Sequence, residues 1–251
     1  FSWRSALLIN GCVALGAVLC MTLLVIRNQP RGTEPGYLEE FAAADAGEAD
    51  EEPDEAGSGK RWSYRELLRS RNFWCLTLGI GLLYGSDQAM VTSNVPFFQD
   101  IGIDLRAAAF IVSCTTVSAI CGKLFVGYIA DKVDLRLVYH GVAGAHIALL
   151  VVYLLEPGYW VLLGFATLFG IAIGGVFPVW STLLAWLFGA RNYGTVMGLM
   201  TIILKGISIV TVRFIGEVYD ATGSYHSAFV VFMAAVVVGM LLIAMVRPHR
   251  A

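Results

Sequence analysis

Residues 122–136 read Gly122-Lys-Leu-Phe-Val-Gly127-Tyr-Ile-Ala-Asp131-Lys132-Val-Asp134-Leu-Arg136. Gly122 and Gly127 remove side-chain bulk from a helix, so that a neighbouring helix can approach closely. Asp131 follows at the helix end, where it can meet basic groups or the positive N-terminus of an adjacent helix. Lys132 and Arg136 are charges that hold a helix end on the cytoplasmic side of a membrane. We expect these charges to form a contact on the cytoplasmic side, here called the inner latch, which breaks when two halves of a protein rotate relative to each other.

Long, nearly uncharged segments surround this stretch. A helix needs about 20 mostly apolar residues to cross ~30 Å of hydrocarbon. The candidate membrane segments are 5–26, 72–99, 107–130, 137–155, 157–190, 192–216 and 221–246. The chain is 57% hydrophobic and 14% charged, against about 25% charged residues in soluble domains. We therefore expect an all-α membrane protein with seven transmembrane helices, and not a disordered protein, a secreted disulfide module or a water-soluble enzyme.

The orientation follows from the basic residues in short loops. If residues 27–72 are cytoplasmic, most basic residues lie on that side, and only Arg4, Arg106 and Arg213 lie on the other. The first helix then runs inward and the C-terminus is cytoplasmic. The expected location is the plasma membrane.

Three regions follow from the spacing of these segments. Residues 1–27 hold one helix, residues 28–72 an acidic linker with a basic amphipathic helix, and residues 73–251 six helices. We interpret the linker as a solvated tether rather than a regulatory tail. Apolar residues at Tyr64, Leu67 and Leu68 suit a helix on the inner membrane surface, for lipid anchoring more than specific lipid recognition. A six-helix unit after a long linker suggests the second half of a twelve-helix transporter, and the start at Phe1 indicates a fragment or a processed product.

The stretch 122–136 closely resembles the G-[RK]-x-x-x-G-x-x-[AS]-D-[RK]-x-G-x-[RK] loop of the major facilitator superfamily. One departure is Asp134, where the family commonly has glycine, and we expect it to weaken a tight turn. Three later stretches look like the monocarboxylate porter and oxalate/formate antiporter branch: Phe188-Gly-Ala-Arg-Asn-Tyr-Gly-Thr-Val-Met-Gly198, Leu204-Lys-Gly206 and Gly216-Glu-Val-Tyr-Asp-Ala-Thr-Gly-Ser-Tyr-His-Ser-Ala-Phe229. The opening Phe1-Ser-Trp-Arg4 resembles the sixth helix of that branch. The resemblance implies alternating access, a bilayer environment and a missing N-terminal half as partner.

Lys205 lies near the middle of segment 192–216. An ammonium there costs ~3 kcal/mol or more, so it must face a partner or a watery cavity. In the oxalate/formate antiporters the matching lysine binds substrate carboxylate, which implies that Lys205 is the substrate-binding cation; a structural ion pair is the alternative. Thr201 and Ser208 share its helix face. Arg213, further along, is either an outer anion-attracting site or a snorkelling interfacial residue.

Asp87 lies near the middle of segment 72–99, and Asn94 lies two turns further on the same side. Gln88 adds a hydrogen-bonding group beside them. Asp87 could carry a proton or neutralise Lys205 when substrate is absent; a helix-packing role is the alternative.

The second helix of the six-helix unit departs from the branch, whose members commonly place an arginine in its middle. Here the helix has no cation until Lys123, which we expect near the cytoplasm. A clamp of two cations is therefore not expected, which favours a substrate with a single carboxylate.

Two functions remain open. The first is secondary active transport of a small organic anion, a monocarboxylate, by proton symport or by exchange with a counter-anion. The second is a non-transporting nutrient receptor or scaffold on the same fold, which would signal through the acidic linker. The sequence shows no catalytic dyad, phosphate loop or basic nucleic-acid face, and its five cysteines lie in membrane segments. We expect no enzyme activity, cofactor, metal or nucleic-acid partner.

Overall fold

The computed structural model describes residues 62–130, 132–189 and 192–246, together with Cys12, Leu15, Gly16 and Leu19, which are helical. The chain separates into two units, residues 1–58 and residues 59–251. The linker 28–60, Asp131 and nearly all of segment 5–26 lie outside the described residues. The elements of the second unit, all of them helices where the chain is described, are α3 (Tyr64–Arg69), α4 (Arg71–Asp100), α5 (Leu105–Ala130), α6 (Leu135–Leu155), α7 (Tyr159–Gly174), α8 (Val176–Phe188), α9 (Tyr193–Thr222) and α10 (His226–Ala244).

Five helical stretches of the described chain are long and apolar enough to cross a membrane. They are Leu105–Ala130, Leu135–Leu155, Tyr159–Phe188, Tyr193–Thr222 and His226–Ala244. This confirms an all-α membrane protein and matches five of the predicted segments. The predicted segment 72–99 forms α4, which is 30 residues long but is not among the five, because the polar run from Ser86 to Asn94 makes it less apolar. Its membrane crossing and that of segment 5–26 stay predictions.

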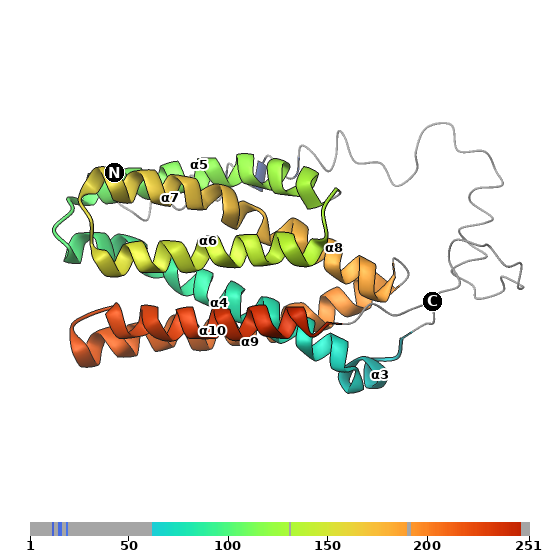
Figure 1. The fold of residues 1–251 in the computed structure, drawn as a ribbon. Helices are drawn as coiled ribbons and strands as arrows, with labels where there is room; N and C mark the ends of the chain where they lie inside the picture. Colours follow the sequence, from blue (N-terminus) through green and yellow to red (C-terminus); the bar gives the residue numbers. More distant parts are fainter. Residues whose placement is uncertain are drawn as a thin grey trace, which may run out of the picture. The chain divides into compact units, whose positions relative to one another are not determined.

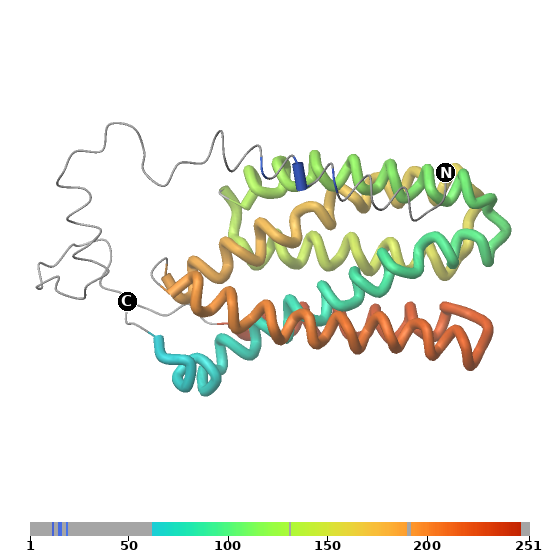
Figure 2. The backbone as a smooth tube through the Cα atoms, turned by 180° about the vertical axis from the view of Figure 1, so that it is seen from behind, coloured from blue at the N-terminus to red at the C-terminus, as the bar shows by residue number. Residues whose placement is uncertain are grey.

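The helices form two groups joined by α4. Helix α5 packs mainly against α7, while α4 packs against both α9 and α10. Figure 1 shows α5, α6 and α7 running along one another, with α9 and α10 on the other side of α4, and Figure 2 shows the same grouping from behind. Helix α4 therefore contacts the elements of both groups.

Segment 157–190, predicted as one helix, is interrupted at Gly175. Helix α7 ends at Gly174 and α8 begins at Val176. Pro178 has no backbone N–H and so cannot donate to the carbonyl of Gly174, four residues earlier. Gly175 N–H donates instead to the Ala172 carbonyl at 3.0 Å, a tighter turn than the α-helix makes. The break redirects α8 relative to α7.

Glycines bring the backbones of α5 and α7 into contact. A Cβ atom added at Gly122 would overlap the backbone of Ile171, and one added at Gly174 would overlap the Ala119 carbonyl. At Gly127 an added Cβ would meet nothing within 4 Å. The close approach expected from the motif therefore falls on Gly122, and Gly127 has no such packing role among the described residues.

Asp134 caps α6. Its side chain accepts a hydrogen bond from the backbone N–H of Arg136 at 2.8 Å. An N-cap carboxylate satisfies a donor that the helix itself leaves free. This contact favours the start of α6, while the expected weakening of the preceding turn stays a prediction.

Candidate functional site

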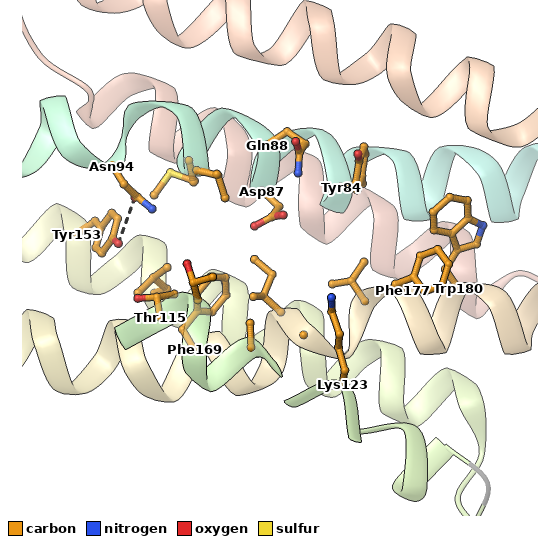
Figure 3. Close-up of a pocket in the computed structure, with 18 residues that line it drawn as sticks. Tyr84, Asp87, Gln88, Asn94, Thr115, Lys123, Tyr153, Phe169, Phe177 and Trp180 are labelled. Carbon is orange, nitrogen blue, oxygen red and sulfur yellow. Dashed lines mark hydrogen bonds between the residues drawn. The ribbon is translucent and has the colours of Figure 1, made fainter. Parts of the chain in front are cut away.

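A cavity of about 480 Å³ lies among α4, α5, α6, α7 and α8. It lies where two buried apolar clusters meet, one around Leu76 and Leu183 and the other around Phe97 and Tyr153. Figure 3 shows its polar groups on facing helices. The labelled lining residues are Tyr84, Asp87, Gln88 and Asn94 of α4, Thr115 and Lys123 of α5, Tyr153 of α6, Phe169 of α7, and Phe177 and Trp180 of α8.

Asp87 is the acid of this cavity. Figure 3 shows its carboxyl group pointing from α4 into the cavity, toward the side that Thr115, Phe169 and Lys123 line. Within the described chain its Oδ1 atom is buried and accepts no hydrogen bond. A buried acceptor without a partner is costly, so the site favours a proton on Asp87 or a donor from a ligand.

Lys123 is the cation of the same cavity. Its ammonium group points toward the space between Asp87 and Phe177 (Figure 3). Among the described residues Lys123 has no ion-pair partner, Asp87 included. The cavity thus holds an acidic and a basic side chain that form no ion pair with each other.

Lys123 was expected near the cytoplasm and was given no role in a binding site, whereas the structure places it in the cavity lining. Helix α5 continues from Lys123 to Ala130, which at ~1.5 Å per residue places the helix end about 10 Å beyond the lysine. Lys123 therefore lies inside an apolar helix. The rule applied to Lys205, that a charge inside such a helix needs a watery cavity or a partner, would have identified it.

Lys205 does not line the cavity, but it contacts Tyr84, a residue that does. Its Nζ donates to the Tyr84 hydroxyl at 2.5 Å and lies 5.1 Å from the centre of that ring. Tyr84 itself lines the cavity. No acid of the described chain lies within ion-pair distance of Lys205. The phenol is thus the contact between the α9 cation and the cavity.

The other predicted residues of α9 make local contacts. Thr201 donates to the Met197 carbonyl at 2.7 Å, and the Ser208 carbonyl accepts from Thr211 at 3.0 Å. Arg213 pairs with Glu217 at 2.7 Å, and both side chains are largely exposed. The structure does not bring these three residues to the cavity lining.

Polar groups cluster at the end of the cavity away from Phe177 and Trp180. Asn94 Oδ1 accepts from the Tyr153 hydroxyl at 3.3 Å (Figure 3). The Asn94 amide nitrogen forms no hydrogen bond to any described residue. It is available to donate to a ligand oxygen. Thr115, by contrast, donates to the Ile111 carbonyl at 2.9 Å and is held by its own helix.

Aromatic rings form the other end. Phe177 and Trp180 pack edge to face with centroids 5.5 Å apart, and Trp180 lies 6.5 Å from Tyr84. Both α8 rings follow the break at Gly175, so the break sets their position. They offer an apolar surface for the body of a ligand.

A buried hydrogen bond ties α4 to α6 beside Asp87. Ser86 Oγ and His146 Nε2 are 2.7 Å apart, and both side chains are buried. The His146 ring also packs against Phe169 at 5.3 Å. The hydrogen bond between Ser86 and His146 fixes the turn of α4 that carries Asp87.

The motif at residues 122–136 is described except for Asp131. Lys132 donates to the Tyr128 hydroxyl, and the Arg136 guanidinium lies 5.6 Å from the centre of the Trp186 ring. Arg136 Nε is buried without a hydrogen-bond partner among the described residues. Because Asp131 lies outside the described residues, the latch stays a prediction.

Comparisons with known proteins identify the family. The sequence model of the Major Facilitator Superfamily matches residues 1–201 and again residues 77–251. Monocarboxylate transporter 12 of Rattus norvegicus is 25% identical over 98% of this chain and 54% of its own length. Monocarboxylate transporter 2 of Homo sapiens is 25% identical over 94% of this chain and 51% of its own length. The chain spans about half the length of the curated relatives it matches.

Two solved structures share the fold. The fucose:proton symporter of E. coli aligns with a TM-score of 0.61 and 18% identity, covering 94% of this chain and 65% of the symporter. A bacterial homologue of the human lysosomal transporter Spinster, inward-facing and unoccupied, aligns with a TM-score of 0.50 and 14% identity over 92% and 54% of the two chains. These identities show the fold alone. Together with the five apolar helices, the family match makes this an integral, multi-pass membrane protein, and the chain belongs to the major facilitator superfamily of transporters.

Proposed function

We propose that this chain is the C-terminal half of a secondary active transporter, preceded by the last helix of the N-terminal half, and that it moves a small monocarboxylate by alternating access. The observation that carries the proposal is the cavity that Asp87 and Lys123 share without pairing. The similarity to monocarboxylate transporters supports it. In this proposal seven segments span the plasma membrane and the C-terminus is cytoplasmic.

Lys123 binds the substrate carboxylate. A hydrogen bond between an ammonium group and a carboxylate is about twice as strong as a neutral one. The free amide nitrogen of Asn94 and the amide of Gln88 donate further hydrogen bonds, and the rings of Phe177 and Trp180 pack against the apolar body. A volume of about 480 Å³ falls in the range typical of small-molecule sites, ~300–1,000 Å³.

Lys205 contributes through Tyr84. The ammonium polarises the phenol that it contacts at 2.5 Å, so the hydroxyl becomes a better donor toward an anion in the cavity. Thr201 and Ser208 share the Lys205 face of α9 and line the path that the N-terminal half completes. Arg213 attracts anions at the outer end, weakened by its pairing with Glu217.

Asp87 carries the coupled proton. Its Oδ1 has no hydrogen-bond partner among the described residues, so a proton removes a charge that a low-dielectric cavity disfavours. A protonated Asp87 and a carboxylate bound to Lys123 leave the site without net charge. With both substrate and proton bound, the transporter can pass through its occluded form and release the two together on the other side of the membrane, which is proton symport.

Two elements allow the site to change its accessibility. The break at Gly175 separates α7 from α8 beside the cavity, and such breaks absorb backbone rotation when a helix bends. Gly122, Gly127, Asp131, Lys132 and Arg136 form the inner latch that opens when the two halves rock.

Uptake of a radiolabelled monocarboxylate into liposomes that carry the full-length protein tests the proposal. We expect saturable uptake that an unlabelled monocarboxylate inhibits and the corresponding neutral amide does not, because only the carboxylate can pair with a cation. Binding measured in parallel separates the alternatives. Ligand binding without flux would support a receptor, and equal inhibition by the amide would contradict an anion site.

A further inference from the structure

The end of the bundle that carries α3 has a structure that transport through the cavity does not explain. We propose that α3 and the first turn of α4 form a binding site for the phosphate headgroup of an anionic phospholipid. The site is defined by Arg65, Arg69 and Arg71 with Tyr64 and Leu68, and it does not depend on the proposed transport function.

Helix α3 is fixed to the bundle. Leu67 is fully buried in the core. The Trp62 N–H donates to Asn192 Oδ1 at 3.1 Å, and the Trp62 ring packs edge to face on Phe188 at 5.7 Å. The Ser63 N–H donates to Glu66 Oε2 at 2.9 Å, which closes the first turn. The short helix is therefore held in one orientation by its contacts.

This orientation places α3 at the membrane surface. Its anchors, Phe188 and Asn192, lie at the end of α8 and just before α9. Both helices belong to stretches that are long and apolar enough to cross a membrane, so their ends lie where hydrocarbon gives way to headgroups. Figure 1 shows α3 at the same end of the bundle as α8.

An apolar stripe of α3 stays uncovered. Tyr64 and Leu68 are one turn apart and are 63% and 45% exposed. The exposed Trp74 side chain donates its Nε1–H to the Leu68 carbonyl at 2.7 Å. Tyrosine and tryptophan at the end of a membrane helix are typical of the interface, where the ring lies among the headgroups.

A basic stripe runs beside the apolar one. Arg65 and Arg69 are four residues apart and lie about 100° round the helix from Tyr64 and Leu68. Arg71 opens α4, and all three arginines are exposed. Among the described residues none of the three has an ion-pair or hydrogen-bond partner. Their positive charge is therefore available to a ligand.

An anionic phospholipid matches both stripes. A guanidinium group can donate two parallel hydrogen bonds to two oxygens of one phosphate. The acyl chains of the same lipid molecule cover Tyr64 and Leu68. The acidic segment Glu48–Glu55 of this chain is the alternative occupant, because its carboxylates could pair with the three arginines. Its only uncharged residues, however, are Ala49 and Pro53. It has nothing large and apolar to cover the stripe, so the lipid is the better occupant.

Lipid binding by native mass spectrometry of the full-length protein tests the site, with phosphatidylglycerol and phosphatidylcholine as probes. A basic residue near an anionic surface contributes about fivefold in affinity. We expect the combined substitution Arg65→Gln, Arg69→Gln and Arg71→Gln to reduce phosphatidylglycerol affinity at least tenfold and to leave phosphatidylcholine affinity unchanged. The exposed Arg106→Gln, a single arginine removed from α5, is the control and should keep the preference. The triple variant should fold, because these exposed side chains form no ion pair or hydrogen bond within the described protein.

Two further measurements address the other possible occupants. Leu68→Gln should weaken both lipids alike, since it removes apolar contact and no charge. Unchanged phosphatidylglycerol affinity in the triple variant would overturn the proposal. So would a lipid preference that appears only after deletion of residues 48–55, which would show that the linker fills the site. Complete displacement of the lipid by inorganic phosphate would equally overturn it, because phosphate alone would then be the ligand.

Discussion

Replacing Gly122 by alanine tests the contact between α5 and α7. A Cβ atom at this position would lie 2.7 Å from the carbonyl carbon and Cα of Ile171 and still closer to its oxygen. These are backbone atoms of a packed helix and cannot rotate away as a side chain could. Overpacking costs about 1–3 kcal/mol, and we take the upper value, about 3, because backbone opposes the methyl group.

Helix propensity acts in the other direction. Alanine in a helix interior is about 1 kcal/mol more favourable than glycine. The net loss in the free energy of unfolding for Gly122→Ala is therefore about 2 kcal/mol. Gly127→Ala is the matched control on the same helix, because an added Cβ there meets nothing within 4 Å. It should gain about 1 kcal/mol.

Thermal unfolding of the full-length protein in detergent, followed by a thiol-reactive or intrinsic fluorescence signal, measures the difference. For a domain of this size 1 kcal/mol shifts Tm by roughly 2–4 °C. Gly122→Ala should lower Tm by about 4–8 °C, and Gly127→Ala should raise it by about 2–4 °C. Shifts of the same sign and size in both variants would refute the backbone contact.

Three further predictions concern other contacts. If Lys205 acts through Tyr84, Tyr84→Phe and Lys205→Met should each raise the KM for the carboxylate by a similar factor, roughly tenfold. The double variant should then show no larger increase in KM than either single variant. Additive increases in uptake assays would contradict the action of Lys205 through Tyr84. Asp87→Asn should preserve exchange between two anion pools while abolishing proton-driven accumulation in liposomes; equal loss of both modes would assign Asp87 a structural role. Asp134→Ala should cost about 1 kcal/mol by removing the cap of α6, and an unchanged Tm would show that the hydrogen bond to Arg136 contributes nothing.

The sequence was most informative where charge is absent. Long segments with at most two charges predicted α5, α6, α9 and α10, because membrane-spanning length and apolar composition can be read directly from the chain. The helical period also placed Asp87 and Asn94 on one face, and both line the cavity. The break at Gly175 was missed, because glycine and proline are tolerated inside membrane helices and neither predicts a break by itself.

The site needed the three-dimensional packing. Lys123 was read as a surface charge, since a lysine two turns from a helix end fits that role equally well in one dimension. Tyr84 lies on the same helix stripe as Asp87, but an aromatic residue in an apolar helix is ordinary and did not indicate a contact with Lys205. Its importance comes from a contact with Lys205, 121 residues away along the chain. The periodicity of residues within one helix cannot predict which side chains of a different helix they contact.

Carboxylate uptake by the full-length protein with Lys123→Met tests the proposed function most directly, since Lys123 is the cation that we propose binds the carboxylate. Loss of a hydrogen bond to a charged group is worth about 1.5–3 kcal/mol, which is roughly a 10- to 150-fold loss of affinity. Arg106→Met removes an exposed charge from the same helix and serves as the control. The account predicts a loss of this size in Lys123→Met with normal membrane insertion, and near-normal uptake in Arg106→Met. Uptake by Lys123→Met that equals the unmodified protein would contradict the account.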